Sequence, residues 1–242
     1  MNKTSIIKKT TAFLLALISI LVNTVSSFAY DKSLDEFIRK AENFRIIVVD
    51  QEGTTIGSIT IDIDKLCSSQ ETLKCIKDTT FEEWDRRFKT EVMGLDPSNI
   101  DTECRLTVYY KEANTLVDSD NTEVKGTGTF SKTSKTKKTV TVVNSNYPSM
   151  SYTTTYYAHV KVTYKQSGNV ITTISGTSFY TTSLSSDYAT EGLSFANYVA
   201  SDGHSCGTTA NYTLYRYWDV YGVPIKFSKN CVDHVIAYNY EH

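Results

Sequence analysis

The sequence has few of the short motifs that mark common functional classes. It contains no phosphate-binding glycine loop and no basic-aromatic nucleic-acid motif. No pair of carboxylates stands in a setting typical of glycoside hydrolysis. Positive charge is not in excess either, because 25 Lys+Arg oppose 27 Asp+Glu for a net charge of −2. Since phosphate neutralisation dominates affinity for nucleic acid, we expect no nucleic-acid partner, and we expect no cofactor and no bound metal.

One segment departs from this charge balance. Residues 131–138, "SKTSKTKK", hold four lysines in eight positions. Their polar composition predicts a solvated loop between two strands. The alternative is a patch for anionic polymers or lipid headgroups.

The N-terminal residues 1–29 have the order of a secretory signal peptide. Three lysines without an acid are followed by the apolar stretch "AFLLALISILV" and then by small residues ending in "SSFA". The apolar stretch is shorter than the roughly 20 residues that a membrane span needs. We therefore expect cleavage after Ala29 and a secreted, extracellular protein with no stable membrane anchor after cleavage; a retained signal anchor is the alternative.

Cysteine is present in an odd number. The five cysteines follow the predicted signal peptide, so the expected compartment permits disulfides, and at least one thiol is free or pairs between chains. The connectivity is open, but proximity in the sequence favours two pairs and leaves Cys104 over. The favoured pairs are Cys206 with Cys231 and Cys67 with Cys75.

The composition divides the chain near residue 115. Residues 30–115 form a mixed α/β region, in which a capping-box spacing at Ser33 predicts a short helix. A strand, a tight turn and a second strand follow, the latter with Asp62 and Asp64 on its outer face. The segment "TTFEEWDRRFKTEV" is predicted to be a helix because its apolar residues recur at spacings of three and four. That apolar stripe consists of Phe81, Trp84, Phe88 and Val92.

Residues 116–242 form a β-rich region. Their segments are rich in β-branched and aromatic residues, and "AHVKVTYK" alternates strictly between apolar and polar positions. Several short strands with turn signals between them are typical of a sandwich or an open barrel. The predicted fold class is therefore α+β, with a mixed N-terminal region of one or two helices and a C-terminal antiparallel β-sandwich-like region.

The stretch "DGHSCGTTANYTLYRYWD", residues 202–219, contains the main candidate chemistry. Its Cys-Gly pair and the small and aromatic residues after it resemble the nucleophile helix of papain-like cysteine peptidases of the double-glycine-leader type. The later segment "HVIAYNY" resembles the strand that carries the base in that family. This resemblance implies a cysteine hydrolase with Cys206 as nucleophile and His234 as base.

Two other interpretations use the same residues. The pairs His204-x-Cys206 and Cys231-x-x-His234 have the residue types of a tetrahedral zinc site. The preferred interpretation is a disulfide between Cys206 and Cys231 that crosslinks the last two strands, because it suits the expected compartment. This interpretation makes the stretch structural and assigns no catalytic residue.

Tyrosine is abundant in the C-terminal part of the chain. Of 17 tyrosines, 14 lie beyond residue 146, more than a core needs. Tyrosine offers rigid amphipathic contact area for protein or sugar recognition, although β-propensity alone also enriches it in strands. The whole chain resembles the small secreted β-rich proteins of unknown function found in Gram-positive bacteria. We therefore expect a non-catalytic domain that binds cell-wall glycan or protein through a Tyr/Thr-rich surface, with the cysteine hydrolase as the alternative.

Overall fold

The computed structural model describes residues 33–77, 79–99, 104–119 and 126–239. The predicted signal peptide, residues 1–29, lies outside the described residues, so secretion stays a prediction. Within the described part of the chain, no helix is long and apolar enough to span a membrane.

Two β-sheets build most of the molecule. The first sheet has six strands in the order β3-β1-β2-β10-β9-β8, and the second has four in the order β4-β5-β6-β7. The strands of the six-stranded sheet are β1 (Arg45–Val49), β2 (Thr55–Ile61), β3 (Arg105–Thr107), β8 (Tyr188–Val199), β9 (Ser205–Val220) and β10 (Val223–Tyr238). The strands of the four-stranded sheet are β4 (Tyr109–Ser119), β5 (Gly128–Val143), β6 (Tyr152–Ser167) and β7 (Val170–Thr182). All the pairings are antiparallel except that of β1 with β3.

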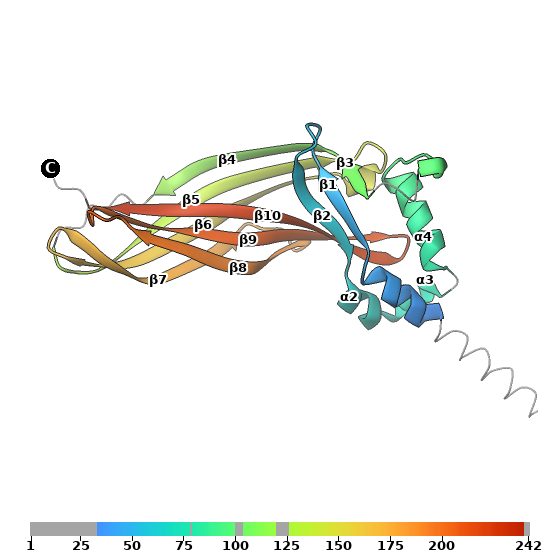
Figure 1. Ribbon diagram of the computed structural model, residues 1–242, viewed down its shortest axis with the longest axis horizontal. Coiled ribbons are helices and arrows are strands. Elements are labelled where there is room, and N and C mark those ends of the chain that lie inside the picture. Colours follow the sequence, from blue (N-terminus) through green and yellow to red (C-terminus); the bar gives the residue numbers. More distant parts are fainter. Residues whose placement is uncertain (1–32, 78, 100–103, 120–125, 240–242) are drawn as a thin grey trace, which may run out of the picture.

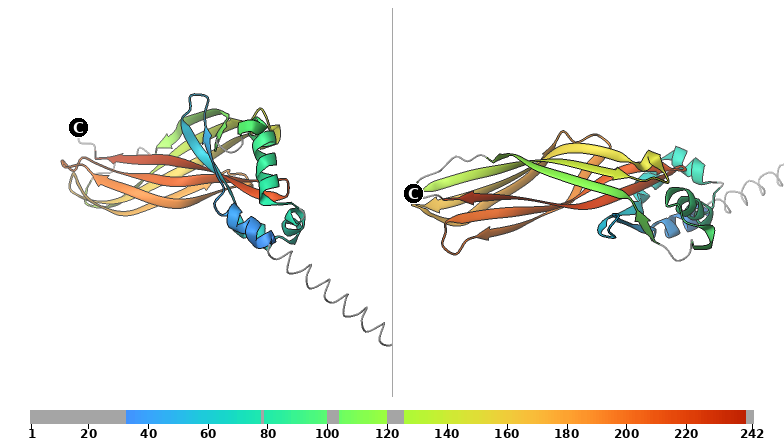
Figure 2. Two further views of the ribbon diagram at one scale, coloured as in Figure 1. Left: turned by 45° about the vertical axis from the view of Figure 1, so that its right-hand side comes forward. Right: turned by 90° about the horizontal axis from the view of Figure 1, so that it is seen from above.

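The helices gather at one end of an elongated β body (Figures 1 and 2). They are a helix over residues 33–41, α2 (Ile63–Ser68), α3 (Gln70–Ile76), α4 (Phe81–Arg87), the π-helical turn η1 (Phe88–Val92) and the 3₁₀ turns η2 (Pro97–Asn99) and η3 (Pro148–Met150). The coarse prediction of an α+β chain dominated by strands is therefore confirmed.

The predicted helices of the N-terminal region are present. Thr80 caps α4 by accepting a hydrogen bond from the Glu83 backbone N–H at 3.2 Å. The stripe predicted on this helix is buried at Trp84, Phe88 and Val92. Amphipathic spacing and a capping residue are local signals, so the sequence was sufficient to locate this element.

The strand predicted to run past Asp62 ends earlier. β2 stops at Ile61, and the Asp62 carboxylate accepts a hydrogen bond from the Lys65 backbone N–H at 2.8 Å. Asp62 is therefore the N-cap of α2 and Asp64 lies in its first turn, so their predicted place on a strand face was wrong. Asp is a preferred N-cap residue because its carboxylate satisfies an unpaired N–H group of the first turn.

The predicted loop over residues 131–138 was also wrong. These residues lie inside β5, where Ser134 and Lys138 point inward and are buried. A strand can carry threonine, serine and lysine when one of its faces is exposed to solvent. Pairing with β4 on one side and β6 on the other fixes β5 in the sheet.

The two sheets share one interior. Side chains from β6 pack with side chains from β9 and β10 in two apolar clusters, and a third cluster joins the helices to β1, β2 and the β9–β10 turn. The division expected at residues 115 and 116 falls inside β4, and β2 pairs with β10. The early and late parts of the chain therefore contribute to the same sheet.

Candidate functional site

The structure separates Cys206 from Cys231. In the β9–β10 hairpin Cys206 lies opposite Ala237, whereas Cys231 lies opposite Tyr212. The two cysteines are thus six positions apart along the strands, about 20 Å, far beyond the Cα separation that a disulfide tolerates. Both are free thiols, and the predicted Cys206–Cys231 disulfide was wrong. It failed because both hairpin strands are 16 residues long, so a short sequence separation does not bring these residues together.

The other predicted disulfide is not formed either. Cys67 is an exposed free thiol in α2, and Cys104 is an exposed free thiol just before β3. The side chain of Cys75 lies outside the described residues.

The residues of the cysteine hydrolase alternative lie on opposite faces of one sheet. Cys206 is in a strand rather than a helix and is 0% exposed, and burial raises the pKa of its thiol to about 11. His234 is exposed on the outward face, opposite Thr209. A thiol with a raised pKa and no imidazole beside it is a poor nucleophile, because the thiolate is the reactive form.

The zinc alternative has no corresponding geometry in the described residues. No group of three or more His, Cys, Asp or Glu residues there is placed to hold a metal ion. Residues 203–207 also spell Gly-His-Ser-Cys-Gly, which fits the Gly-x-Ser-x-Gly motif of serine hydrolases. That motif needs a strand-to-helix turn, whereas here it leads from a turn into β9.

These placements predict a simple thiol-labelling result. In the folded protein at neutral pH, iodoacetamide should modify Cys67 and Cys104 and leave Cys206 and Cys231 unmodified, because the last two are buried. Peptide mass spectrometry without reduction provides the readout, and labelling in denaturant confirms that all four thiols can react. Modification of folded Cys206, or its recovery in a disulfide-linked peptide, would contradict the structure.

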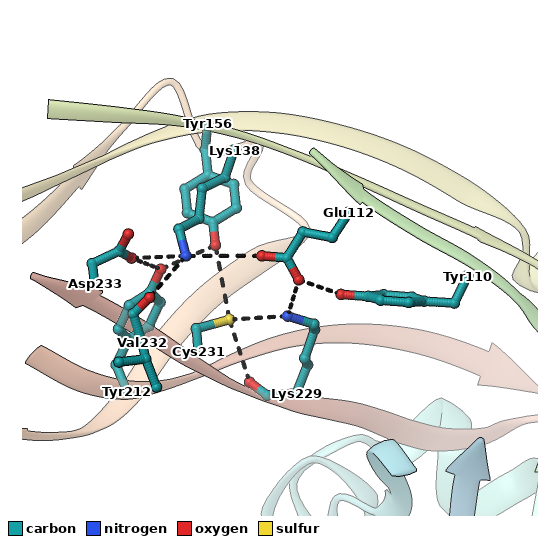
Figure 3. Close-up of polar contacts among 9 residues, drawn as sticks. All are labelled: Tyr110, Glu112, Lys138, Tyr156, Tyr212, Lys229, Cys231, Val232 and Asp233. Carbon is teal, nitrogen blue, oxygen red and sulfur yellow. Dashed lines mark hydrogen bonds and ion pairs between the residues drawn. The ribbon is translucent and has the colours of Figure 1, made fainter. Parts of the chain in front are cut away.

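A charged network lies buried between the sheets (Figure 3). Lys138 of β5 places Nζ 3.0 Å from the Asp233 carboxylate of β10 and donates a hydrogen bond to the Val232 carbonyl at 3.1 Å. The Tyr212 hydroxyl donates to the same Asp233 carboxylate at 2.9 Å. Lys138 and Asp233 are 2% and 5% exposed, so this ion pair is almost dry.

A second ion pair extends the network. Lys229 of β10 donates to the Glu112 carboxylate of β4 at 2.7 Å, and the Tyr110 hydroxyl donates to the same carboxylate oxygen. The Cys231 thiol lies 3.7 Å from Lys229 Nζ and 3.9 Å from the Tyr156 hydroxyl. Two lysines therefore balance two carboxylates, and the contacts join β4 and β5 of one sheet to β10 of the other.

The electrostatics of this network favour its charged form. Desolvation by itself would raise the pKa of Glu112, but the bonds from Lys229 and Tyr110 outweigh it and lower that pKa to about 2. Desolvation opposes the charge of Lys229, yet its contacts with Cys231, Glu112 and Tyr110 raise its pKa above the ordinary value. The network is closed and internally neutral, which suits a structural link between the sheets rather than a reaction centre.

The outward face of the four-stranded sheet has a different chemistry. Side chains alternate along its strands, and the positions opposite the buried ones carry hydroxyl groups and lysines. Hydroxyl pairs connect β5 to β6 across this face, at Ser131–Thr163 (2.9 Å), Thr139–Thr155 (3.1 Å) and Thr141–Thr153 (3.1 Å). The outward lysines are Lys111, Lys135, Lys137, Lys161 and Lys165. We call this surface the lysine face.

Aromatic rings lie near the middle of the lysine face. His159 stacks on Tyr180 of β7 with ring centroids 4.4 Å apart and planes 8° from parallel. The His159 ring is also hydrogen-bonded to the Thr182 hydroxyl at 3.0 Å, while Lys135 lies 4.6 Å from the Tyr157 ring centroid. Tyr180 is 50% exposed, so one ring of a fixed pair faces solvent.

Comparison with known proteins adds no family to these observations, since no family model, no curated protein and no solved structure matches the chain. The alternation in "AHVKVTYK" already placed His159, Lys161 and Lys165 on one side of a strand. It did not place Lys135 and Lys137 beside them, because the register between β5 and β6 is a tertiary feature. A strand-like alternation within "SKTSKTKKTVTVV" was the available signal for those two lysines.

Proposed function

We propose that this protein is a secreted, non-catalytic β protein that binds glycan through the lysine face. The observation that carries this proposal is the fixed combination of paired hydroxyl groups and an aromatic stack with one half-exposed ring on the same outward sheet surface. Hydroxyl groups can exchange hydrogen bonds with sugar hydroxyls, and an aromatic ring provides an amphipathic surface for a sugar ring.

Further features support glycan as the ligand class. The hydroxyl pairs follow the strand direction, so an extended chain laid along β5 and β6 would meet the same chemistry repeatedly. The His159–Tyr180 stack is held by the Thr182 hydrogen bond before any ligand arrives. Because the rings are already fixed, their ordering adds less to the entropic cost of binding.

Binding of purified bacterial cell walls tests this function. We expect the mature protein to sediment with the walls and to give hits on a glycan array. Tyr180→Ala should weaken binding about two- to thirteenfold, the loss expected when an aromatic contact of about 0.5–1.5 kcal/mol is removed. The matched control is Tyr198→Ala, because Tyr198 is 44% exposed in β8 of the other sheet.

Two results would contradict the proposal. A protein that neither binds cell walls nor gives a hit on the glycan array has no glycan ligand of the expected kind. Equal losses for the Tyr180 and Tyr198 variants would place any binding elsewhere than on the lysine face. Thermal unfolding of each variant, followed by circular dichroism, shows whether the fold is intact.

A further inference from the structure

We propose that the ligand of the lysine face is a polyanionic glycan, a sugar chain that carries sulfate, phosphate or carboxylate groups at repeated positions. This inference rests on the glycan-binding function proposed above and specifies the chemistry of the ligand. Its basis is the unequal distribution of charge between the two outward faces of the molecule.

Positive charge is concentrated on the lysine face. Its five lysines come from β4, β5 and β6, while the acidic residues of the four-stranded sheet are Glu112 and Asp118. Glu112 points inward and is bound to Lys229, and Asp118 lies on the edge strand, in register with Lys135. Among the described side chains, which do not include that of Asp118, no acid forms an ion pair with any of the five lysines.

The opposite face provides an internal comparison. On the outward side of the six-stranded sheet, Lys226 of β10 is bound to the Glu191 carboxylate of β8 at 2.7 Å. That lysine is therefore paired with an acid, and the whole chain has more acids than bases. The excess of lysine over acid on the lysine face thus reflects where these residues lie in the sheet and not a basic composition.

The lysines form a row rather than a cluster. Lys111 of β4 lies opposite Thr141 of β5, which lies opposite Thr153 of β6. Lys137 lies opposite Tyr157 and Lys135 opposite His159. Lys161 and Lys165 are on β6 itself. Along β6, Lys165 lies twelve positions beyond Thr153, a length of about 40 Å. A compact anion would meet one or two of these lysines, whereas an extended polymer with repeated negative groups would meet most of them.

The same face favours glycan over other polyanions. Serine and threonine outnumber lysine among its outward positions, and hydroxyl groups suit a ligand rich in hydroxyl groups. Single-stranded nucleic acid is bound by several aromatic rings that stack successive bases. On the lysine face Tyr180 is stacked with His159 and the Tyr157 ring is covered by Lys135, so both tyrosine rings already have a partner.

Dextran sulfate is the test ligand, and uncharged dextran of the same length is its matched control. The mature protein should bind dextran sulfate in 50 mM salt and not uncharged dextran, and 200 mM salt should weaken binding at least about tenfold, because salt screens exposed charges. Lys161→Thr should weaken binding several-fold, and the triple variant Lys135→Thr/Lys137→Thr/Lys161→Thr should abolish it. Lys226→Thr also removes one outward strand lysine and should leave binding unchanged.

The possible failures differ from those of the proposed function. Binding to cell walls that depends on Tyr180, without binding to dextran sulfate, would overturn the polyanionic assignment and leave glycan binding intact. Binding to neither would remove both proposals. Unchanged binding by the folded triple variant would exclude the lysine face as the site. Tighter binding to phosphatidylglycerol vesicles or to single-stranded DNA in the same assay would replace glycan with that ligand.

Discussion

Replacing Lys138 with methionine is expected to lower the free energy of unfolding by about 3–5 kcal/mol, the range seen when one partner of a buried ion pair is removed. Lys138 is 2% exposed and provides the cation for Asp233, which is itself 5% exposed. Methionine keeps most of the side-chain volume, so the loss reports charge rather than a cavity. Without Lys138, Asp233 keeps the hydrogen bond from Tyr212 but no longer has its counter-ion. Urea denaturation followed by circular dichroism measures the change.

Two variants separate the charge from other effects. The double variant Lys138→Met/Asp233→Asn removes both charges and should be more stable than Lys138→Met alone, although it contains one more substitution. Lys137→Met changes the neighbouring residue of β5, which points outward, and should alter stability by no more than about 0.5 kcal/mol. If the double variant were the less stable one, an uncompensated charge on Asp233 would not explain the loss.

The two neighbouring lysines show where sequence patterns stop being informative. Lys137 and Lys138 have the same side chain and the same local surroundings, yet one faces solvent and the other is buried in an ion pair. What distinguishes them is the direction of the strand face and the acid that β10 places opposite it. Asp233 is 95 residues away in the chain, and no local signal links the two.

Local signals were sufficient elsewhere in the fold. Residues 33–41 and α4 were predicted from a capping residue and an apolar stripe, both of which lie within one or two helical turns. The residues that the alternation placed on one side of β6, Ala158, Val160, Val162 and Tyr164, are all buried. These features depend on neighbours in sequence, which is why they could be predicted without knowledge of the tertiary structure.

The Cys206–Cys231 disulfide was predicted wrongly because cross-strand pairing depends on the register of the hairpin. Cys206 and Cys231 both point inward from adjacent strands, as a cross-strand pair would, but lie at different levels of the hairpin. The turn at residues 221 and 222 sets that register, with Tyr221 at φ 55° and Gly222 at φ 78°. A turn displaced by a few residues would pair different side chains, so sequence proximity of two cysteines carried little information.

The helical end of the molecule should depend strongly on Trp84. We expect Trp84→Ala to lower the free energy of unfolding by about 3–5 kcal/mol, the usual loss when a buried tryptophan is truncated. Trp84 is 1% exposed and packs against Phe44 at 5.1 Å and Phe88 at 5.3 Å between ring centroids. Its indole N–H also donates to the Val220 carbonyl at 2.9 Å. Urea denaturation monitored by far-ultraviolet circular dichroism measures the loss.

Trp84→Phe separates packing from hydrogen bonding. Phenylalanine retains an aromatic ring against Phe44 but cannot donate to the Val220 carbonyl, and Val220 is 0% exposed. Losing one hydrogen bond costs about 0.5–1.5 kcal/mol, so this variant should lie between the native protein and Trp84→Ala. Equal stability of Trp84→Phe and the native protein would show that the indole bond contributes nothing. The helices would then be held to the end of the β9–β10 hairpin by apolar packing and by the contacts of Tyr221 with Glu91 and Arg87.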